Sequence, residues 1–516
     1  MLISVIASAS NSRTQGTAST SWRQHDLLAA PPYVEWPDQT MTPRQVRQVM
    51  SGLLLAMFAA ALSGTIVINA LPRIVHELGG EQRQYTWVIA ATLLAATASG
   101  PIWGKLADRM SKKLLVQLSL SVFFAGTILA GLSPTTGALI GFRVIQGLGA
   151  GGLIALANIV IATVIGARSR GRYLGYLAAV GASATVAGPP LGGLIIDVPF
   201  LGWRWCFWAG APLAIAALVL LQKTLQVPVT TAETRLDWYG ALLIPAGISV
   251  LLVWITLGGG SFDWLSWPSA AVLGVSASAI FLSVVAERRA ADPVVPPHLF
   301  RDRTIVLVVV ASAALEVGIV SAWAFVAQYF QIARGYAPSQ SGLMMLPMMA
   351  AMVLTTLVCS RLVARAGRWK RNVVMGAALA VVALGLLGTI DRATSLWLIG
   401  VYAAVLGFGI GASVPYLIIA AQDSLSHRDL GAGTSMVMFF RLLGAAAGVS
   451  VLGAVFANHV TGSMAGGVAQ ASVVQAAYGD ATASTFRVTA AIVLVGFICV
   501  VFIKEKPLRT TVHGHH

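Results

Sequence analysis

One acidic residue, Glu316, lies deep inside a long apolar stretch of this 516-residue chain. It falls 12 residues into the stretch 304–329, so the rise of an α-helix would place it near the middle of a bilayer. The other 18 carboxylates lie in polar segments or at the ends of apolar stretches. Because a carboxylate in hydrocarbon is costly, Glu316 is a candidate proton carrier or counter-charge for a cationic substrate. A structural pair with Arg143 or Arg441 is the alternative.

A second ionisable group lies in the segment LIGFRVIQGLGAGG. Arg143 falls about six residues, or about 9 Å, into the apolar stretch 137–160. A guanidinium at this depth should face a cavity or a partner, unless it snorkels to the interface. Gln146 lies on the same helix face, and the glycines that follow allow close helix contact. We therefore expect Arg143 and Gln146 to take part in proton coupling or substrate binding.

Other polar and aromatic side chains in the apolar stretches are candidates for lining a cavity. Three of them are aromatic residues that follow Glu316 on its own segment, for which lipid-facing or interfacial positions are the alternative. The cavity candidates are Ser63, Asn69, Trp323, Phe325, Tyr329 and Arg441.

A charged loop, GKLADRMSKK at 104–113, holds four cations and one carboxylate between two apolar stretches. Its Lys and Arg content alone would anchor one side of a membrane protein. Asp108 and Arg109, at a helix end, could in addition hold two helices together in one conformation and release them in another. We expect Gly104, Asp108 and Arg109 to act in gating.

Small residues and two prolines meet in GASATVAGPPLGG, residues 181–193. Glycines at this spacing favour close helix packing. Pro189 and Pro190 predict a bend at a defined point of the helix, which suits a rocking motion. The residues that we expect to act here are Gly181, Gly188, Pro189 and Gly192.

The composition excludes a soluble domain, since 57% of the residues are hydrophobic, 10% are charged and the mean hydropathy is +0.79. The chain is therefore expected to be an all-α polytopic membrane protein. Its net charge of +15 comes from cations spread over short loops, so no nucleic-acid partner is expected. Cys206, Cys359 and Cys499 are expected to be packing residues without disulfides, and no metal site or cofactor is predicted. GPIWGKL lacks the spacing and the Ser or Thr of a phosphate loop, so the chain is not expected to be an ATPase or another enzyme.

Stretches of about 20 apolar residues predict 14 transmembrane helices. They lie near 50–71, 86–104, 114–133, 137–160, 173–195, 205–222, 238–258, 268–286, 304–329, 340–360, 372–390, 396–420, 432–457 and 485–503. Alternate loops and both tails hold 26 of the 34 Lys and Arg residues, whereas the opposite loops hold six. Both termini are therefore expected in the cytoplasm.

An internal repeat relates the two ends of the chain. The charged loop at Gly104 has a degraded copy, SRLVARAGRWKR, that begins 256 residues later at Ser360 and carries Ala364 in place of the aspartate, so any latch is asymmetric. The first six predicted spans correspond to the last six, and from residue 104 to residue 192 the matches need no gap. Two six-helix bundles related by a pseudo-two-fold axis, with two inserted helices, are the predicted architecture, a plan typical of secondary transporters.

The expected organisation is set by these spans. The predicted segments are a disordered cytoplasmic tail at 1–49, an N-terminal bundle at 50–222, a linker with two inserted helices at 223–303, a C-terminal bundle at 304–503 and a cytoplasmic tail at 504–516. The first segment is proline-broken and polar, which favours a tail over a signal peptide, and Met41 or Met50 is an alternative start. The Gly/Ala/Ser/Thr-rich segment 458–484 is expected to be a flexible loop.

The chain resembles the major facilitator superfamily and, within it, the 14-span drug:proton antiporters of the EmrB/QacA type. The resemblance rests on GKLADRMSKK, LIGFRVIQGLGAGG, GASATVAGPPLGG and ALSGTIVINALP at 61–72, with GWRWCFW and FFRLLGAAAG as further matches, and it covers about 50–503. It implies the major facilitator fold and proton-coupled export of amphipathic, often cationic compounds by alternating access. By position it implies gating by Asp108 and Arg109, proton transfer assisted by Arg143, and an antiporter bend at Gly188 and Pro189.

Two departures from the family pattern matter. The second glycine of the loop motif is Ser111 here. The acidic residue common in the family's first-span motif is replaced by Ser63, which leaves Glu316 as the main deep carboxylate. The sequence thus predicts a proton-driven exporter of hydrophobic or cationic small molecules in the inner (plasma) membrane, with the bilayer as its surroundings and its oligomeric state left open. Export of an endogenous metabolite or lipid, and a non-transporting membrane sensor or scaffold, are the alternatives.

Overall fold

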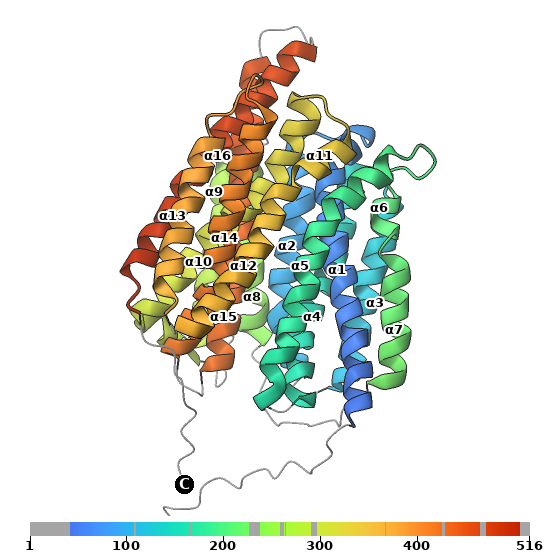
Figure 1. Ribbon diagram of the computed structural model, residues 1–516, viewed down its shortest axis with the longest axis vertical. Coiled ribbons are helices and arrows are strands. Elements are labelled where there is room, and N and C mark those ends of the chain that lie inside the picture. The colour runs from blue at the N-terminus through green and yellow to red at the C-terminus, as the bar shows by residue number, and fades with distance from the viewer. Residues whose placement is uncertain are drawn as a thin grey trace, which may run out of the picture. The chain divides into compact units, whose positions relative to one another are not determined.

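A computed structural model of the chain describes residues 42–107, 110–165, 167–225, 238–257, 263, 265–289, 297–366, 368–425, 429–464 and 471–505. Long helices dominate these residues (Figure 1). They are α1 (Pro43–Glu77), α2 (Gln82–Ala107), α3 (Lys112–Gly131), α4 (Thr136–Val164), α5 (Ala167–Asp197), α6 (Trp205–Trp208), α7 (Ala211–Thr224), α8 (Trp238–Leu257), α9 (Trp267–Arg289), η1 (Pro297–Arg301), α10 (Arg303–Gln328), η2 (Tyr329–Ala333), α11 (Pro338–Met344), α12 (Leu346–Ala366), α13 (Lys370–Leu387), α14 (Leu396–Ser424), α15 (Leu430–Met464) and α16 (Ala471–Phe502).

The predicted spans agree with these helices. Among the described residues, 13 helical segments are long and apolar enough to cross a membrane, and α6 with α7, α10 with η2, and α11 with α12 each count as one segment. The remaining predicted span, 238–258, falls on α8, whose recognised apolar part is the shorter stretch Ala246–Ile255. The all-helical polytopic fold is confirmed, and the number 14 stays a prediction.

Two predicted boundaries are wrong. Residues 43–49, assigned to the tail, form the first two turns of α1, because Thr42 and Gln45 make a capping box and Pro43 occupies the first helical turn. The segment 458–484, assigned to a flexible loop, is largely helical. Its alanines favour helix, and Tyr478 of α16 packs edge-on against Phe456 of α15 with ring centroids 5.5 Å apart.

The two related halves repeat the same helix contacts. In the N-terminal half, α1 packs on α5 and α7, α4 packs on α2 and α3, and α3 packs on α7. In the C-terminal half, α10 packs on α15 and α16, α14 packs on α12 and α13, and α13 packs on α16. Each pair in the second half corresponds to the pair of the same order in the first, although the 256-residue offset carries α7 only to the beginning of α16. The internal repeat in the sequence is therefore a repeat of tertiary packing.

Helices α8 and α9 form an inserted hairpin. The Ser276 hydroxyl donates to the Gly247 carbonyl at 2.8 Å, and the Trp254 indole donates to the Ser269 hydroxyl at 2.8 Å. Gly247 allows this close approach, since a Cβ there would lie 3.0 Å from the backbone nitrogen of Ile280. Outside the hairpin, α8 contacts both α2 and α15, one helix from each half.

The two ends of the helix bundle differ in which helix termini they hold. The basal end is the one at which α1 begins and α16 ends, and the opposite end is the distal end (Figure 1). At the basal end the Glu505 carboxylate accepts from the backbone N–H groups of Trp369 and Lys370 at 3.0 and 3.1 Å. This bond caps the start of α13 and ties the segment after α16 to the C-terminal half.

Candidate functional site

A buried ion pair occupies the C-terminal half. The Arg441 Nε of α15 donates to the Glu316 Oε2 of α10 at 2.5 Å. The Glu316 side chain is 10% exposed, whereas the Arg441 side chain keeps 24% of its surface. Of the two structural partners considered from the sequence, Arg441 is the one that Glu316 contacts. Because the Arg441 side chain is the more exposed of the two, its guanidinium can form hydrogen bonds with other groups more easily than the Glu316 carboxylate can.

Glycines set the distance between the two helices that carry this pair. A Cβ at Gly444 would lie 2.8 Å from the Cα of Ala313, and one at Gly448 would lie 2.6 Å from the Val317 side chain. Only glycine allows α15 to approach α10 this closely. Arg441 precedes Gly444 by three residues and lies on the same face of α15, so this approach brings its guanidinium to Glu316.

A small central cavity lies between the two halves. The empty space between its atoms, about 150 Å³, is nowhere wide enough to admit a water molecule, so the cavity is collapsed in this conformation. Its lining consists of Thr65, Ile68, Pro189, Trp323, Met345 and Met349. Trp323 follows Glu316 by seven residues, or two turns of α10, so both residues lie on the same helix face about 10 Å apart along the axis. The ion pair thus lies on the basal side of an apolar, aromatic and methionine-lined cavity.

Two of the three aromatic cavity candidates are placed wrongly by the sequence interpretation. Trp323 lines the central cavity, but Phe325 is fully buried and stacks on Phe456 with ring centroids 5.2 Å apart. Tyr329 is also buried, and its hydroxyl donates to the Asp391 carbonyl at 2.6 Å. Successive helix residues are rotated by about 100°, so these side chains leave α10 in different directions. Phe325 and Tyr329 face neither the central cavity nor lipid.

Arg143 and Gln146 form a polar network in the N-terminal half. The Arg143 Nη1 donates to Gln146 Oε1 at 2.5 Å, and its Nε donates to the Val88 carbonyl at 3.3 Å. The Gln146 amide donates to the Ser63 hydroxyl at 3.0 Å and to the Thr127 hydroxyl at 2.8 Å. Arg143 is 4% exposed, so it does not snorkel to the interface. The network joins α4 to α1, α2 and α3. The two oxygens that accept hydrogen bonds from Arg143 are both uncharged.

The glycines of the 181–193 segment pack against α1. A Cβ at Gly188 would meet the Thr65 side chain, and a Cβ at Gly192 would meet the Ile66 backbone. Helix α5 continues through Pro189 and Pro190 to Asp197. Gly188 and Gly192 therefore serve close packing, as their counterparts Gly444 and Gly448 do, whereas a Cβ at Gly181 would meet nothing within 4 Å.

Asn69 joins the two halves near the distal end. Its Nδ2 donates to the Pro189 carbonyl of α5 at 3.0 Å and to the Pro338 carbonyl of α11 at 2.9 Å. Its Oδ1 accepts from the Ser341 hydroxyl at 3.1 Å, and its backbone carbonyl accepts from the Gln331 amide at 2.8 Å. Asn69 is fully buried. Asn69 therefore bonds the two halves together. It is not among the residues that line the central cavity, although Thr65 and Ile68 of the same helix are.

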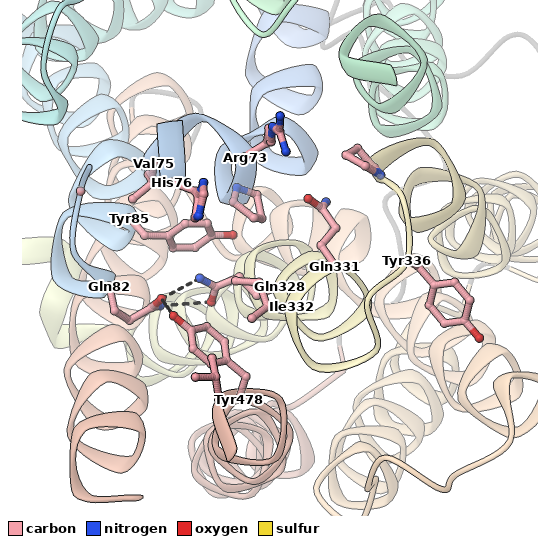
Figure 2. Close-up of a pocket in the computed structure, with 14 residues that line it drawn as sticks. Arg73, Val75, His76, Gln82, Tyr85, Gln328, Gln331, Ile332, Tyr336 and Tyr478 are labelled. Carbon is pink, nitrogen blue, oxygen red and sulfur yellow. Dashed lines mark hydrogen bonds between the residues drawn. The ribbon is translucent and has the colours of Figure 1, made fainter. Parts of the chain in front are cut away.

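A second group of bonds between the halves lies beside it. The side-chain amides of Gln82 on α2 and Gln328 on α10 donate to each other at 3.1 and 2.8 Å, and the Tyr478 hydroxyl donates to Gln82 Oε1 at 3.4 Å (Figure 2). The Tyr85 hydroxyl donates to the Ala324 carbonyl at 2.7 Å. We call these residues, with Asn69, Gln331 and Ser341, the distal cluster. It joins the two halves at the distal end.

A pocket of about 390 Å³ adjoins the distal cluster. Its lining residues are Pro72, Arg73, Val75, His76, Gly80, Gln82, Tyr85, Gln328, Gln331, Ile332, Tyr336, Pro338, Val474 and Tyr478 (Figure 2). Both halves contribute to it. The Arg73 guanidinium pairs with Glu77 at 2.6 Å, and that pair is well exposed. The pocket is a vestibule on the far side of the closed cluster from the central cavity.

The predicted gating residues are only partly visible. Asp108 and Arg109 lie outside the described residues, and Gly104 is half-buried near the basal end of α2, where a Cβ would meet nothing within 4 Å. The gating role of all three stays a prediction. Cys206 and Cys359 are buried and Cys499 is half-buried, in keeping with packing roles.

Sequence reasoning missed most of the distal cluster. Gln82, Tyr85, Gln331 and Ser341 lie close to the ends of predicted spans, where polar residues are ordinary. Gln328 gave no clearer signal, because it lies one residue from the end of the predicted span 304–329. Which groups these side chains bond to depends on how the two halves meet.

These features define a polytopic membrane transporter built from two related halves, with a central cavity, a buried ion pair beside it and a closed cluster at one end. The sequence model of the Major Facilitator Superfamily matches residues 53–449. The chain belongs to this superfamily. The prediction of a secondary transporter, not an enzyme, is therefore confirmed.

Similar proteins share this membership. The chain is 34% identical to "Multidrug transporter protein MdtP" of Bacillus subtilis over 407 residues, covering 79% of this chain and 74% of that protein. It is 31% identical to "Efflux pump dotC" of Dothistroma septosporum over 452 residues, covering 86% and 77%.

Solved structures show the same fold. A bacterial homologue of the human lysosomal transporter Spinster, in an inward-facing and occupied conformation, matches with a TM-score of 0.62 and 14% identity, covering 90% of this chain and 97% of that one. The human organic anion transporter MFSD10 (TETRAN) matches with a TM-score of 0.61 and 16% identity, covering 89% and 100%.

Proposed function

We propose that this protein exports amphipathic, often cationic, small molecules in exchange for protons, by alternating access. The observation that carries the proposal is the Glu316–Arg441 pair, a membrane-buried carboxylate on the cavity face of α10. The names of the relatives, a multidrug transporter and an efflux pump, support export of small molecules. The proposal includes membership of the 14-span drug:proton antiporters of the EmrB/QacA type and location in the plasma membrane.

Coupling arises from competition for one carboxylate. Ionised Glu316 is compensated by Arg441, and either a proton or a cationic substrate can replace that guanidinium as the compensating charge. Because a carboxylate in hydrocarbon needs one of these partners, binding of the proton and of the cation exclude each other. The apolar part of the substrate would rest against Trp323 and the methionines of the central cavity. Mutual exclusion at one site, combined with alternating access, gives exchange of substrate for proton.

The orientation is proposed from charge. The loops of the basal end hold most of the Lys and Arg residues, which places that end in the cytoplasm. The distal cluster is closed and the central cavity is too narrow for a water molecule, so we propose that substrate reaches the cavity from the basal side only after the halves separate there. Opening toward the other side requires the Asn69 and Gln82 bonds to break. The Arg143–Gln146 network holds α1 to α4 and is proposed to move as part of the N-terminal half.

The absence of the usual first-span carboxylate strengthens the case for Glu316. Ser63, at that position, is 1% exposed and accepts a hydrogen bond from Gln146. It therefore serves the polar network and carries no titratable charge. Glu316 lies in the other half, so proton binding would act on the packing of α10 against α15.

The test is proton release on addition of substrate to purified protein. In weakly buffered detergent solution with a pH-indicating dye, acidified until a proton replaces Arg441 as the partner of Glu316, ethidium should release protons from the wild type, because the cation displaces that proton. Glu316→Gln should release none while still binding ethidium. Glu77→Gln, which changes an exposed carboxylate, is the matched control and should behave as the wild type.

Transport in proteoliposomes completes the test. An imposed proton gradient should drive ethidium movement by the wild type and by Glu77→Gln, but not by Glu316→Gln. Gradient-driven transport that survives in Glu316→Gln would refute the role of this carboxylate. Movement of ethidium without any proton movement would refute exchange.

A further inference from the structure

The vestibule beside the distal cluster is large enough to hold a small molecule. Its volume of about 390 Å³ lies within the range of ligand pockets in proteins, about 300–1,000 Å³, whereas the central cavity is too narrow for a water molecule. Residues of both halves line the vestibule (Figure 2). The exchange of substrate for protons at Glu316 gives this space no role.

Two tyrosine rings form fixed walls of the vestibule. The Tyr85 hydroxyl donates to the Ala324 carbonyl at 2.7 Å, and the Tyr478 hydroxyl donates to Gln82 Oε1 at 3.4 Å. These bonds hold each ring in one orientation. Figure 2 shows the two rings on either side of the amide pair of Gln82 and Gln328. The vestibule therefore offers rigid aromatic surfaces, on which a planar ring can pack.

The charges of the lining favour an anion. Arg73 and His76 line the vestibule, and no Asp or Glu of the described residues does. The Arg73 Nε donates to Glu77, whereas the two terminal nitrogens of its guanidinium and the His76 ring make no hydrogen bond with the described residues. A guanidinium has five N–H donors in a planar fork, so Arg73 can bind a second anionic group while it keeps Glu77.

The internal repeat departs from symmetry at the wall of this vestibule. Helix α1 ends at Glu77, and η2 ends at Ala333, 256 residues later. The last turn of α1 is α-helical, whereas η2 is a π-helix in which the Arg334 N–H donates to the Tyr329 carbonyl at 3.0 Å. Single π-turns in long helices occur frequently at functional sites. Gln331 of η2 lines the vestibule, so the irregular turn helps to shape it.

The vestibule is complete only while the two halves meet at the distal end. Gln82 and Tyr85 line it from the N-terminal half, and Gln328, Gln331 and Tyr478 line it from the C-terminal half. All five belong to the distal cluster, so their separation would pull the walls apart. A molecule that binds both walls therefore stabilises the closed cluster by RT ln(1 + [L]/Kd), and it must leave before this end opens.

We propose that the vestibule is a second binding site, which takes a small aromatic anion, a carboxylate or a sulfonate, from the non-cytoplasmic side and thereby inhibits transport. The anionic group binds Arg73 with His76 as a further donor, and the ring packs against Tyr85 and Tyr478. The inference rests on the proposed function for the orientation of the chain and for the transport that is inhibited. A cationic substrate binds on the other side of the distal cluster, so the inhibitor and the substrate do not compete for one site.

Binding of 2-naphthalenesulfonate to the purified protein, measured by equilibrium dialysis, tests the site. Arg73→Gln should raise the Kd about tenfold, because hydrogen bonds to a charged group are lost. Glu77→Gln should lower the Kd, since it removes the negative charge that Arg73 compensates. Arg204→Gln, which removes an exposed cation from the same end of the molecule, is the matched control and should bind as the wild type does. The uncharged 2-naphthalenesulfonamide should bind about tenfold more weakly than the sulfonate.

Gradient-driven ethidium transport in proteoliposomes tests the inhibition. The sulfonate is suitable because it stays ionised and so carries no protons across the bilayer. Present on both sides, it should lower the maximum rate of the wild type without raising the ethidium concentration at half-maximal rate. Arg73→Gln should transport ethidium as the wild type does and should need about ten times more sulfonate for the same inhibition.

Cysteine labelling reports directly on the distal cluster. In a background with Cys206, Cys359 and Cys499 replaced by Ser, a cysteine at the buried Ala327 should react with a water-soluble maleimide only when the cluster opens. The sulfonate at about ten times its Kd should slow this reaction about tenfold, because it binds the closed state. Adding Arg73→Gln should remove most of this effect.

The outcomes separate the site from the transport activity. If the sulfonate does not bind, or binds Arg73→Gln as tightly as the wild type, the site is overturned. If the sulfonamide binds as tightly as the sulfonate, the assignment to an anion is overturned. If the bound sulfonate leaves the rate unchanged, or only competes with ethidium, inhibition from the vestibule is overturned. If the wild type does not transport ethidium, the proposed function fails, and dialysis and labelling still decide the site.

Discussion

Replacing Gly444 with alanine should separate the two helices that carry the buried ion pair. The added Cβ would lie 2.8 Å from the Cα, Cβ and carbonyl oxygen of Ala313. Ordinary contact between carbon atoms is about 3.5–4.0 Å, so α15 must move away from α10 by about 1 Å at this point. Arg441, three residues earlier on the same face, would move with it and lose its 2.5 Å bond to Glu316.

The size of the effect depends on two opposing contributions. Overpacking of this kind costs about 1–3 kcal/mol, whereas Gly→Ala in a helix contributes about 1 kcal/mol of stability. Gly431→Ala on the same helix is the matched control, because a Cβ there would meet nothing within 4 Å. Gly431 lies in the first turn of α15, where the gain in helix propensity is smaller than at the interior Gly444, so the two variants should differ by the overpacking less that difference in gain, about 1–2 kcal/mol.

Thermal unfolding of the purified protein and gradient-driven ethidium transport are the assays. Gly444→Ala should unfold several degrees below Gly431→Ala, since about 1 kcal/mol corresponds to a few degrees in large domains. Its transport should fall about tenfold, the change expected for about 1.4 kcal/mol lost from the pair. Equal melting temperatures and equal transport in the two variants would refute the argument that close packing at Gly444 positions the pair.

Three further predictions concern the rest of the bundle. Gln82→Ala removes the amide pair of the distal cluster and should weaken its closed state by about 1–3 kcal/mol. A cysteine at the buried Ala327, next to Gln328 in the chain, should then react faster with a water-soluble maleimide than it does in a chain that keeps the pair. An unchanged rate would show that the pair does not hold this end closed. Glu505→Ala removes the cap of α13 and should cost about 1 kcal/mol in thermal unfolding, whereas the exposed Lys504→Ala should cost nothing measurable. Asp391 lies in the loop before α14, where hydrogen bonds from the Thr394 side chain and backbone and from the Ala393 N–H lower the pKa of its carboxyl group. The ionised carboxylate therefore stabilises the fold above about pH 4, and this stabilisation is lost as the pH falls through the pKa of the folded state. Asp391→Asn should therefore melt below the wild type at pH 7, with the difference shrinking under acid conditions, and a difference that grows in acid would contradict this assignment.

Much of the fold could be predicted because the bilayer imposes simple rules on the sequence. A span needs about 20 apolar residues, and 13 helical segments of the described chain meet that requirement where the sequence placed them. The repeat was visible as matched glycines and cations, and it reappears as matched helix contacts. The two wrong boundaries, at α1 and in 458–484, lie outside the apolar stretches. There helix caps and alanine content decide the structure instead of hydrophobicity.

The candidate site could be predicted only in part. Glu316, Arg143 and Gln146 stood out because polar groups in hydrocarbon are rare, and all three are buried. The rotation of each helix about its own axis was harder to predict from the sequence. Membrane helices are apolar on the lipid side as well as on the protein side, so they lack a clear polar face. Trp323, Phe325 and Tyr329 were therefore grouped together, although only Trp323 lines the central cavity.

The sequence by itself determined that this is a membrane protein of two related halves with an inserted pair of helices and one deep carboxylate, because length, hydropathy and residue spacing are local properties of the chain. Only the tertiary structure decided that Arg441 compensates Glu316, that Asn69 and Gln82 join the two halves at one end, and that α8 packs against one helix of each half. These are relations between segments far apart in the chain. They depend on which helix faces meet, and the packing of the whole bundle decides that.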